Sequence, residues 1–336
     1  MNSSGCSPES CHSERDIGVC SKNKGMGQRG CTRSILNLPN DRVIYMEMGE
    51  SCCQIICLAG YKRQSLRERG CMEKEQILRE TELFVLDMDG TFYLGDRILE
   101  GALEFLGQVE RLGKRFVFFT NNSSRSPREY IDKLARMECK ITRQQIITSG
   151  DVMIRYLKHF YPGKSVYLLG TPALEENFRE NGIFLTQDMP DAVVVGFDMT
   201  LTYEKLERAC TYIRNGADFL ATHLDINCPT ADGFIPDCGA MCACISLSSG
   251  KEPKYVGKPF GETVDMVLDL TGAKREQVAF VGDRLYTDVK TGVAHGARGI
   301  LVLSGEATLA DLAESDVQPD AVFAGLGEMG EILKGF

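Results

Sequence analysis

The chain has 336 residues, a formal net charge of −9, 43% apolar residues and 14 cysteines. Its length indicates about two domains, and its apolar fraction is typical of a globular protein. An acidic chain lacks the basic surface that general nucleic-acid and anionic-membrane binders need, and no stretch approaches the roughly 18 apolar residues of a membrane span. The N-terminus lacks the basic region and apolar run of a secretory signal, so we expect a cytoplasmic protein.

The composition changes near residue 71. Residues 1–71 hold eight of the 14 cysteines and carry ten basic against seven acidic side chains, so their net charge is +3 and that of the remaining chain is −12. Residues 1–34 are rich in Ser, Gly and Cys and show no hydrophobic periodicity, which predicts an unstructured extension over 1–71. Met72 is an alternative natural start. Two alternatives would use the cysteines of this segment. A zinc site is disfavoured because residues 1–34 contain no C-x-x-C pair, and a disulfide scaffold would need an oxidising compartment to which nothing in the sequence directs the chain.

From residue 82 onward, short β-rich runs alternate with helical patterns. Helices are predicted over 102–112, 127–137, 202–214 and 260–271, the second of them capped by Ser126. Alternation of helices with nearly continuous apolar strands predicts an α/β fold with a parallel sheet. The predicted strands span 83–87, 115–120, 165–169, 192–197, 218–222, 278–283 and 299–303.

Four polar clusters each stand at the end of a strand: three end strands of the set above, and the GKP cluster follows Tyr255 and Val256. They are DMDGT (87–91), TNNSS (120–124), GKP (257–259) and GDRLYTD (282–288). Each one alone is as well explained by a turn or a helix cap. In open parallel sheets, however, sites form at the carboxyl ends of strands, and four such clusters together indicate one site.

The residue types at these positions suit phosphoryl transfer through an aspartyl phosphate. The Asp87 carboxylate can attack phosphorus as a nucleophile. Asp89 can protonate the leaving alcohol and then deprotonate the attacking water. Such a site needs a counter-charge, most plausibly Mg²⁺, held by the carboxylates of Asp87 and Asp283 and by the backbone carbonyl of Asp89. Asp288 would orient the waters of that metal ion.

The remaining cluster residues supply positive charge and hydrogen-bond donors. Lys258 would balance the negative charge on the nucleophile and on the phosphate. Thr120, Asn121 and Asn122 form the predicted phosphate-binding segment, in which the Thr120 hydroxyl and backbone N–H groups bind phosphate oxygens. Positioning and electrostatic stabilisation of this kind are the main contributions of a protein to phosphoryl transfer.

These four segments resemble the motifs of the haloacid dehalogenase (HAD) superfamily, and they are most similar to its NagD / p-nitrophenylphosphatase-like branch. The resemblance runs from about residue 82 to the C-terminus and does not cover 1–71. It implies a Mg²⁺-dependent phosphatase with a Rossmann-like parallel-sheet core and an inserted α/β cap domain. Asp87 and Asp89, with an intact fourth segment, resemble the phosphatases of the superfamily rather than its dehalogenases.

The spacing of the clusters locates the inserted domain. Only 30 residues separate Asp89 from Thr120, which leaves room for a flap-like loop (92–100) and one helix, whereas 137 separate Thr120 from Lys258. The longer connection must hold an α/β unit, predicted over 160–251 and flanked by core segments 72–159 and 252–336. The branch carries its large cap at this position. Caps in this branch can dimerise, so a homodimer through the cap is one alternative for an oligomeric state that the sequence leaves open.

Segment 221–240 of the predicted cap resembles the substrate-specificity loop of the family. His223 and Asp225 could face the substrate, although relatives often have Asn where His223 stands. An equally good interpretation makes His223 a satisfied polar residue at the end of a strand. Four cysteines nearby allow a zinc site, but Cys242 and Cys244 are better explained as small apolar residues packed on a helix.

The leading hypothesis is a phosphatase of small phosphate monoesters, of the p-nitrophenyl phosphate, sugar phosphate or nucleotide type. Its partner is then a small phosphorylated metabolite rather than a nucleic acid or a membrane. One alternative is a phosphotransferase or mutase using the same aspartyl phosphate, but mutases of this superfamily usually carry a helical cap between the first two motifs. A non-catalytic phosphometabolite-binding protein is the other alternative, although no chemical group of the site is missing.

Overall fold

The computed structural model describes residues 32–38, 42–49, 52–58, 74–230 and 233–336, and the chain divides into two compact units, Met1–Met72 and Glu73–Phe336. In the first unit, three strands form an antiparallel sheet in the order β1-β2-β3. These strands are β1 (Thr32–Leu38), β2 (Arg42–Gly49) and β3 (Cys52–Leu58).

This sheet differs from the unstructured extension that we predicted over 1–71. The difference concerns residues 32–58, where β2 and β3 contain Val, Ile and Tyr, residue types that favour strands. The other residues of 1–71, including the first 31, lie outside the described residues.

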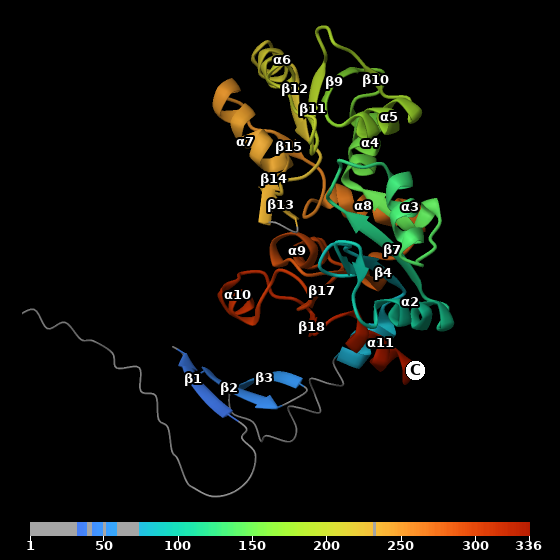
Figure 1. Ribbon diagram of the computed structural model, residues 1–336, viewed down its shortest axis with the longest axis vertical. Helices are drawn as coiled ribbons and strands as arrows, with labels where there is room; N and C mark the ends of the chain where they lie inside the picture. Colours follow the sequence, from blue (N-terminus) through green and yellow to red (C-terminus); the bar gives the residue numbers. More distant parts are fainter. Residues whose placement is uncertain (1–31, 39–41, 50–51, 59–73, 231–232) are drawn as a thin grey trace, which may run out of the picture. The chain divides into compact units, whose positions relative to one another are not determined.

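In the second unit, six parallel strands form the core sheet, in the order β18-β17-β16-β4-β7-β8. The order places β4 in the interior, between β16 and β7, so the segments that follow these three strands emerge side by side at one edge of the sheet (Figure 1). The strands are β4 (Leu83–Leu86), β7 (Arg115–Thr120), β8 (Ile146–Thr148), β16 (Val278–Gly282), β17 (Arg298–Val302) and β18 (Ala321–Phe323).

Both faces of the core sheet are buried, which explains why its strands are apolar throughout. The four residues of β4 alternate between two hydrophobic layers, because successive side chains of a strand point to opposite faces. Phe84 packs with Phe105 of α2 in one layer, where the two ring centroids lie 5.3 Å apart. Val85 belongs to the other layer, which includes Val264 of α8.

A second parallel sheet, here called the cap sheet, has the strand order β10-β9-β11-β12-β15. Helices α6 and α7 cover one of its faces, and α4 and α5 lie at the other (Figure 1). The strands are β9 (Ser165–Leu169), β10 (Phe184–Leu185), β11 (Ala192–Val195), β12 (Asp218–Ala221) and β15 (Lys254–Tyr255).

All five cap-sheet strands lie in the chain between β8 and β16 of the core sheet. The predicted end of the inserted domain at residue 251 differs from the observed sheet, because β15 pairs with β12 through Leu220 and Lys254. Such a short strand leaves almost no pattern in the sequence. We propose that the inserted domain begins near residue 160, as predicted, and extends to Tyr255.

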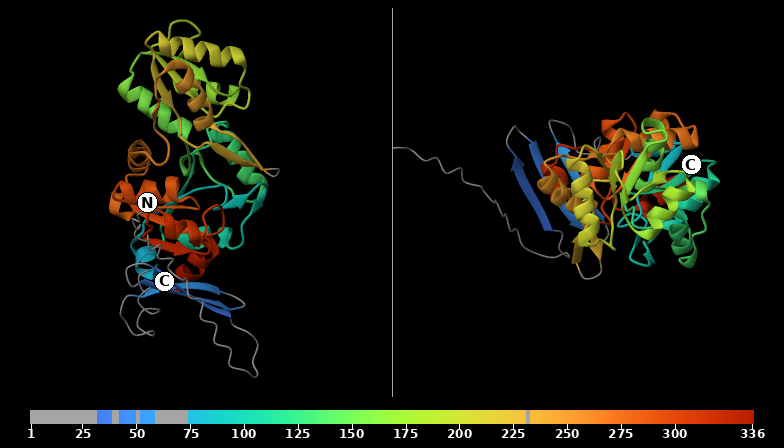
Figure 2. Two further views of the ribbon diagram at one scale, coloured as in Figure 1. Left: turned by 90° about the vertical axis from the view of Figure 1, so that its left-hand side faces the viewer. Right: turned by 90° about the horizontal axis from the view of Figure 1, so that it is seen from above.

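Two hairpins lie outside both sheets. The hairpin of β5 (Tyr93–Leu94) and β6 (Arg97–Ile98) occupies the predicted flap-like loop. The hairpin of β13 (Asn227–Thr230) and β14 (Gly233–Pro236) extends from the cap sheet toward the core sheet, and the turned views of Figure 2 show it in gold.

The helices that the sequence predicted are confirmed to within a residue or two. Ser126 caps α3 together with Glu129 in a reciprocal pair of hydrogen bonds. No helix among the described residues is long and apolar enough to cross a membrane. The helices are α2 (Ala102–Arg111), α3 (Pro127–Arg136), α4 (Ser149–Phe160), α5 (Pro172–Glu180), α6 (Tyr203–Arg214), α7 (Cys238–Ser249), α8 (Gly261–Thr271), α9 (Lys290–Ala294), α10 (Leu309–Glu314) and α11 (Leu326–Lys334).

Candidate active site

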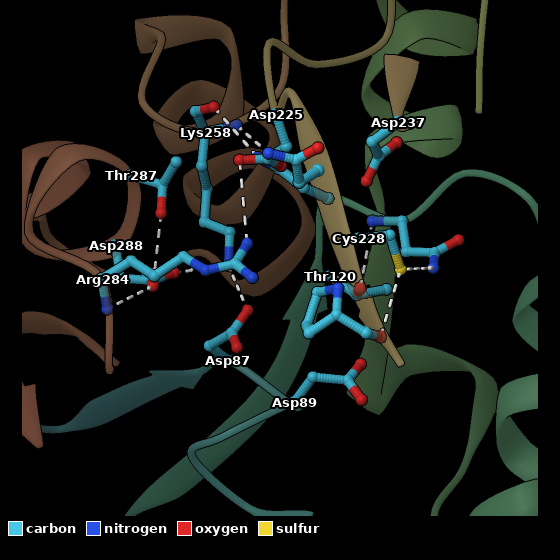
Figure 3. A pocket seen from close by; sticks show the side chains of 14 residues that line it. Asp87, Asp89, Thr120, Asp225, Cys228, Asp237, Lys258, Arg284, Thr287 and Asp288 are labelled. Carbon is cyan, nitrogen blue, oxygen red and sulfur yellow. Dashed lines mark hydrogen bonds and ion pairs between the residues drawn. The ribbon is translucent and has the colours of Figure 1, made fainter. Parts of the chain in front are cut away.

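A pocket lies where the carboxyl ends of β4, β7 and β16 meet residues 221–240 of the inserted domain, here called the cap segment (Figure 3). The four predicted clusters all contribute to its wall, and the cap contributes five further residues. The lining residues are Asp87, Asp89, Thr120, Asn121, Asn122, Asp225, Asn227, Cys228, Pro229, Asp237, Lys258, Arg284, Thr287 and Asp288.

Lys258 is the central cation of this pocket. Its ammonium group donates hydrogen bonds to Asp87 Oδ1 and to Asp288 Oδ1, each at 2.5 Å, and it is only 3% exposed. Burial opposes its charge, yet Asp288 and Asp87 together raise the pKa of Lys258 above its ordinary value. Lys258 therefore stays charged and holds the Asp87 carboxylate from one side.

Three carboxylates converge beside that ammonium group. Oxygen atoms of Asp87, Asp283 and Asp288 lie within 4.8 Å of one another. Among residues 74–230 and 233–336, these three are the set of acidic, His or Cys side chains that lie close enough together to share a metal ion. Burial raises the pKa of Asp87 well above its usual range, and burial together with Asp288 raises that of Asp283 to about 6. Three carboxylates around one ammonium leave an excess of negative charge.

These residues fit a hard divalent cation. Carboxylate oxygens are the ligands that Mg²⁺ prefers, and a divalent charge would offset the repulsion between carboxylates that adds to burial in raising the two pKa values. The Asp89 side chain is not part of this group, and its predicted contribution was the backbone carbonyl. The four cap cysteines form no such group either: Cys238 and Cys242 are buried, whereas Cys244 is exposed, contrary to its predicted packing.

Two glycines and a backbone N–H group hold Asp283 in place. Asp283 Oδ2 accepts a hydrogen bond from Glu306 N at 2.7 Å. A Cβ atom on Gly90 would lie 2.3 Å from this oxygen, and one on Gly305 would lie 2.0 Å from it. Our sequence prediction missed Gly305 and Glu306, although they follow β17 and form a fifth polar cluster after a strand, which is the signal that would have found them.

Asp89 lies two residues beyond Asp87 and lines the same pocket (Figure 3). Its Oδ2 accepts a hydrogen bond from the Tyr93 hydroxyl of the flap hairpin at 3.2 Å. Burial raises the pKa of Asp89, while the nearby Lys133 and the hydrogen bond from Tyr93 act in the opposite direction. A carboxyl with a raised pKa is suited to donating a proton as well as accepting one.

The TNN segment ends β7 and connects three parts of the site. Asn121 Nδ2 donates to Asp225 Oδ2 at 2.8 Å and to the backbone carbonyl of Lys258 at 3.1 Å, and Asn121 Oδ1 accepts from Lys258 N at 2.9 Å. The Thr120 hydroxyl accepts from Asn122 N at 3.1 Å, which fixes the turn that follows the strand. Thr120, Asn121 and Asn122 therefore lie together at the pocket wall.

The two predicted cap residues lie in different environments. Asp225 lines the pocket, and its Oδ1 is buried without a hydrogen-bond partner, 3.8 Å from Arg284 Nη1. His223 is fully buried and is not among the residues that line the pocket. Its burial and its hydrogen-bond partners favour the satisfied polar residue that we weighed beside a substrate contact, and the substrate contact stays a prediction.

Sequence reasoning also missed Arg284, Asn227 and Asp237 as pocket residues. Arg284 lies within the GDRLYTD segment, so its position was available, but its role depends on the fold. It donates to Glu306 Oε2 at 2.8 Å and approaches Asp225 of the cap segment. No local sequence pattern distinguishes Asn227 or Asp237 from ordinary turn residues.

Comparison with known proteins agrees with this geometry. Residues 84–184 match the model of the haloacid dehalogenase-like hydrolases, and residues 255–329 match a HAD-hydrolase-like model. An acid sugar phosphatase from Staphylococcus aureus (strain MRSA252) is 34% identical over 252 residues, which cover 75% of this chain and 97% of the relative.

Two solved structures are similar over nearly their whole length. A 4-nitrophenylphosphatase from Thermotoga maritima is 45% identical with a TM-score of 0.74, covering 76% of this chain and 98% of its own. NagD from E. coli K-12 is 31% identical with a TM-score of 0.69, covering 74% of this chain and 98% of its own. The core sheet and the cap sheet are thus those of a haloacid dehalogenase-like hydrolase, and the chain belongs to this family. Within it, the chain falls in the NagD-like branch, which confirms the predicted fold class.

Proposed function

We propose that this protein is a Mg²⁺-dependent phosphatase that hydrolyses small phosphate monoesters through an aspartyl phosphate on Asp87. The observation that carries the proposal is the arrangement around that residue. Its carboxylate is held by Lys258 at 2.5 Å and lines a pocket together with Asp89 and the TNN segment. The relatives named acid sugar phosphatase and 4-nitrophenylphosphatase support phosphate monoesters of the sugar and aryl types as substrates.

In the first half of the reaction, the Asp87 carboxylate attacks phosphorus and the bond to the alcohol oxygen breaks. Lys258 keeps the attacking carboxylate oriented and offsets the charge of the phosphate oxygens. Asp89, in its protonated form, gives its proton to the leaving alcohol. The Thr120 hydroxyl and the backbone of the TNN segment bind the transferring group.

In the second half, water attacks the phosphorus atom of the aspartyl phosphate and releases inorganic phosphate. The Asp89 carboxylate, ionised after the first step, takes the proton of that water and returns to its starting state. When bound by Asp87, Asp283 and the Asp89 carbonyl, with Asp288 at its waters, Mg²⁺ would supply positive charge to the phosphate oxygens. Asp288 accepts hydrogen bonds from Lys258 Nζ at 2.5 Å and from Arg284 N at 3.3 Å, which connects the fourth cluster to the lysine.

A phosphotransferase would use the same Asp87 chemistry but a different acceptor. The cap segment brings polar residues to the pocket, and nothing among the described residues favours a second acceptor over water. The predicted cap homodimer stays a prediction.

The test uses purified full-length chain with Mg²⁺ and a panel of sugar phosphates, nucleotides and p-nitrophenyl phosphate. We expect Asp87→Asn to lower kcat by at least about 10³-fold, because the nucleophile is lost. Asp96→Asn, the same change on an exposed acid of the flap hairpin, is the matched control. Acid-quenched wild-type enzyme should show a phosphoryl group on the peptide that contains Asp87.

Chelation with EDTA should silence the enzyme, and added Mg²⁺ should restore it. Retained turnover in Asp87→Asn, or full activity without a divalent cation, would contradict the proposal. Phosphorus NMR of the products separates the alternatives, since a transferase would move the phosphoryl group to a second alcohol instead of releasing inorganic phosphate.

A further inference from the structure

A buried histidine connects the cap segment to the core in this protein. His223 follows β12 of the cap sheet and is fully buried. Its Nε2 lies 2.8 Å from Asp237 Oδ1, at the start of α7. Its Nδ1 lies 2.9 Å from Thr222 Oγ1 and 3.4 Å from the hydroxyl of Ser149, the first residue of α4.

The hydrogen-bond partners leave room for a proton on each ring nitrogen. The Asp237 carboxylate only accepts, so Nε2 must donate to it. On the other side, the Ser149 hydroxyl donates its proton to the Asn121 carbonyl, which leaves its oxygen free to accept from Nδ1. The Thr222 hydroxyl contacts Nδ1, Ser123 Oγ and Cys238 Sγ, so it can donate to Nδ1 or accept from it. The geometry therefore accommodates an imidazolium, and the charged groups around the ring decide between the two states.

The charged surroundings favour the same state. Asp237, Asp225 and the Cys238 thiol are the titratable groups that act on the ring. Burial alone would lower the pKa of His223, but the Asp237 carboxylate outweighs it and the pKa rises to about 9. The ring thus carries a positive charge at neutral pH.

The positive charge of His223 affects the substrate pocket through Asp237. Asp237 lines the same pocket as Asp87 and Asp89 and is only 4% exposed (Figure 3). A phosphate monoester carries negative charge at neutral pH, and an unpaired carboxylate in a poorly solvated wall would repel it. His223 is the cation that faces this carboxylate from outside the pocket.

We propose that His223 is a positioning residue whose buried positive charge neutralises Asp237, so that the pocket accepts an anionic phosphate monoester while the cap segment stays hydrogen-bonded to Ser149 beside Asn121. This inference rests on the proposed phosphatase function. It also accounts for a buried polar residue outside the pocket lining at the position where the sequence suggested a substrate contact.

The kinetic test compares three variants on p-nitrophenyl phosphate with Mg²⁺. His223→Gln keeps a donor but removes the charge, and we expect KM to rise about tenfold with kcat within about twofold. Asp237→Asn should raise KM less, because the neighbouring imidazole then loses its proton and the pocket stays neutral. The double variant H223Q/D237N should recover most of the loss in KM seen for H223Q.

A purely structural role predicts a different pattern, since removing both partners would be at least as harmful as removing one. A double variant no better than H223Q, or a loss confined to kcat, would overturn the inference. A wild-type chain that hydrolyses no phosphate monoester would instead refute the proposed function, so the two failures can be told apart.

Nitrogen NMR of ¹⁵N-histidine-labelled chain tests the charge independently of activity and of whether H223Q folds. Among the four histidines, we expect one imidazole to keep both nitrogens protonated at about pH 8, and this signal to disappear in D237N. Four neutral imidazoles at that pH in the wild type would overturn the inference.

Discussion

Asn121 Nδ2 lies 2.8 Å from Asp225 Oδ2, and this buried hydrogen bond joins the end of β7 in the core sheet to the cap segment. The same amide group also exchanges hydrogen bonds with the backbone of Lys258. One side chain therefore fixes the phosphate-binding segment, the lysine segment and the cap segment relative to one another.

Removing the Asp225 side of this bond should weaken catalysis without touching the nucleophile. We expect Asp225→Ala to lower kcat/KM by roughly 10- to 100-fold, the value of a buried hydrogen bond to a charged group. Asp225→Asn keeps an acceptor for Asn121 and should lose less. Steady-state kinetics on p-nitrophenyl phosphate and on a sugar phosphate measure both, and equal kcat/KM in D225A and the wild type would contradict the expectation.

Lys258 should matter mainly to the chemical step. Because its ammonium group holds Asp87 and offsets the phosphate charge, we expect Lys258→Met to lower kcat about 10²- to 10³-fold. Lys254→Met is the control, since that lysine is exposed and pairs with Glu262 at 2.6 Å just before the same segment. The role assigned to Lys258 fails if the two variants turn over substrate equally fast.

Gly90 and Gly95 offer a matched pair for the cation site. Both have positive φ, at 82° and 62°, so a side chain costs each of them similar backbone strain. A Cβ atom on Gly90 would lie 2.3 Å from Asp283 Oδ2, whereas one on Gly95 would meet nothing within 4 Å. We expect Gly90→Ala, but not Gly95→Ala, to weaken Mg²⁺ binding about tenfold or more, measured by titrating activity and thermal stability with Mg²⁺. Equal Mg²⁺ dependence in the two variants would be the contrary result.

The charged pair of His223 and Asp237 should make stability depend on pH. The pKa of His223 is about 9 in the folded chain against an ordinary 6.5, so its stabilisation is fully present below pH 6.5 and is lost as the pH rises to about 9. The upper limit of this contribution is about 3 kcal/mol. Denaturant unfolding of wild type and H223Q across this range measures it, and parallel curves would show that the pair contributes nothing.

Local patterns in the sequence were sufficient to predict much of the site. Asp87, Asp89 and Asp288 follow apolar strands of the core sheet, and the rule that parallel strands end at one edge brings such residues together. Lys258 follows β15 of the cap sheet instead. Short elements such as β15 and the cap-lining residues Asn227 and Asp237 have no comparable signal. Their positions depend on contacts between segments far apart in the chain.

The sequence by itself determined the alternation of strands and helices, the parallel core sheet and the residue types of the phosphoryl-transfer chemistry. These follow from local hydrophobic periodicity and from which side chains stand directly after each strand. Only the tertiary structure decided that Asp225 and Asp237 line the pocket while His223 is buried behind Asp237. Asp225 and His223 are separated by one position, and only packing against Ser149 and Asn121 of the core distinguishes them.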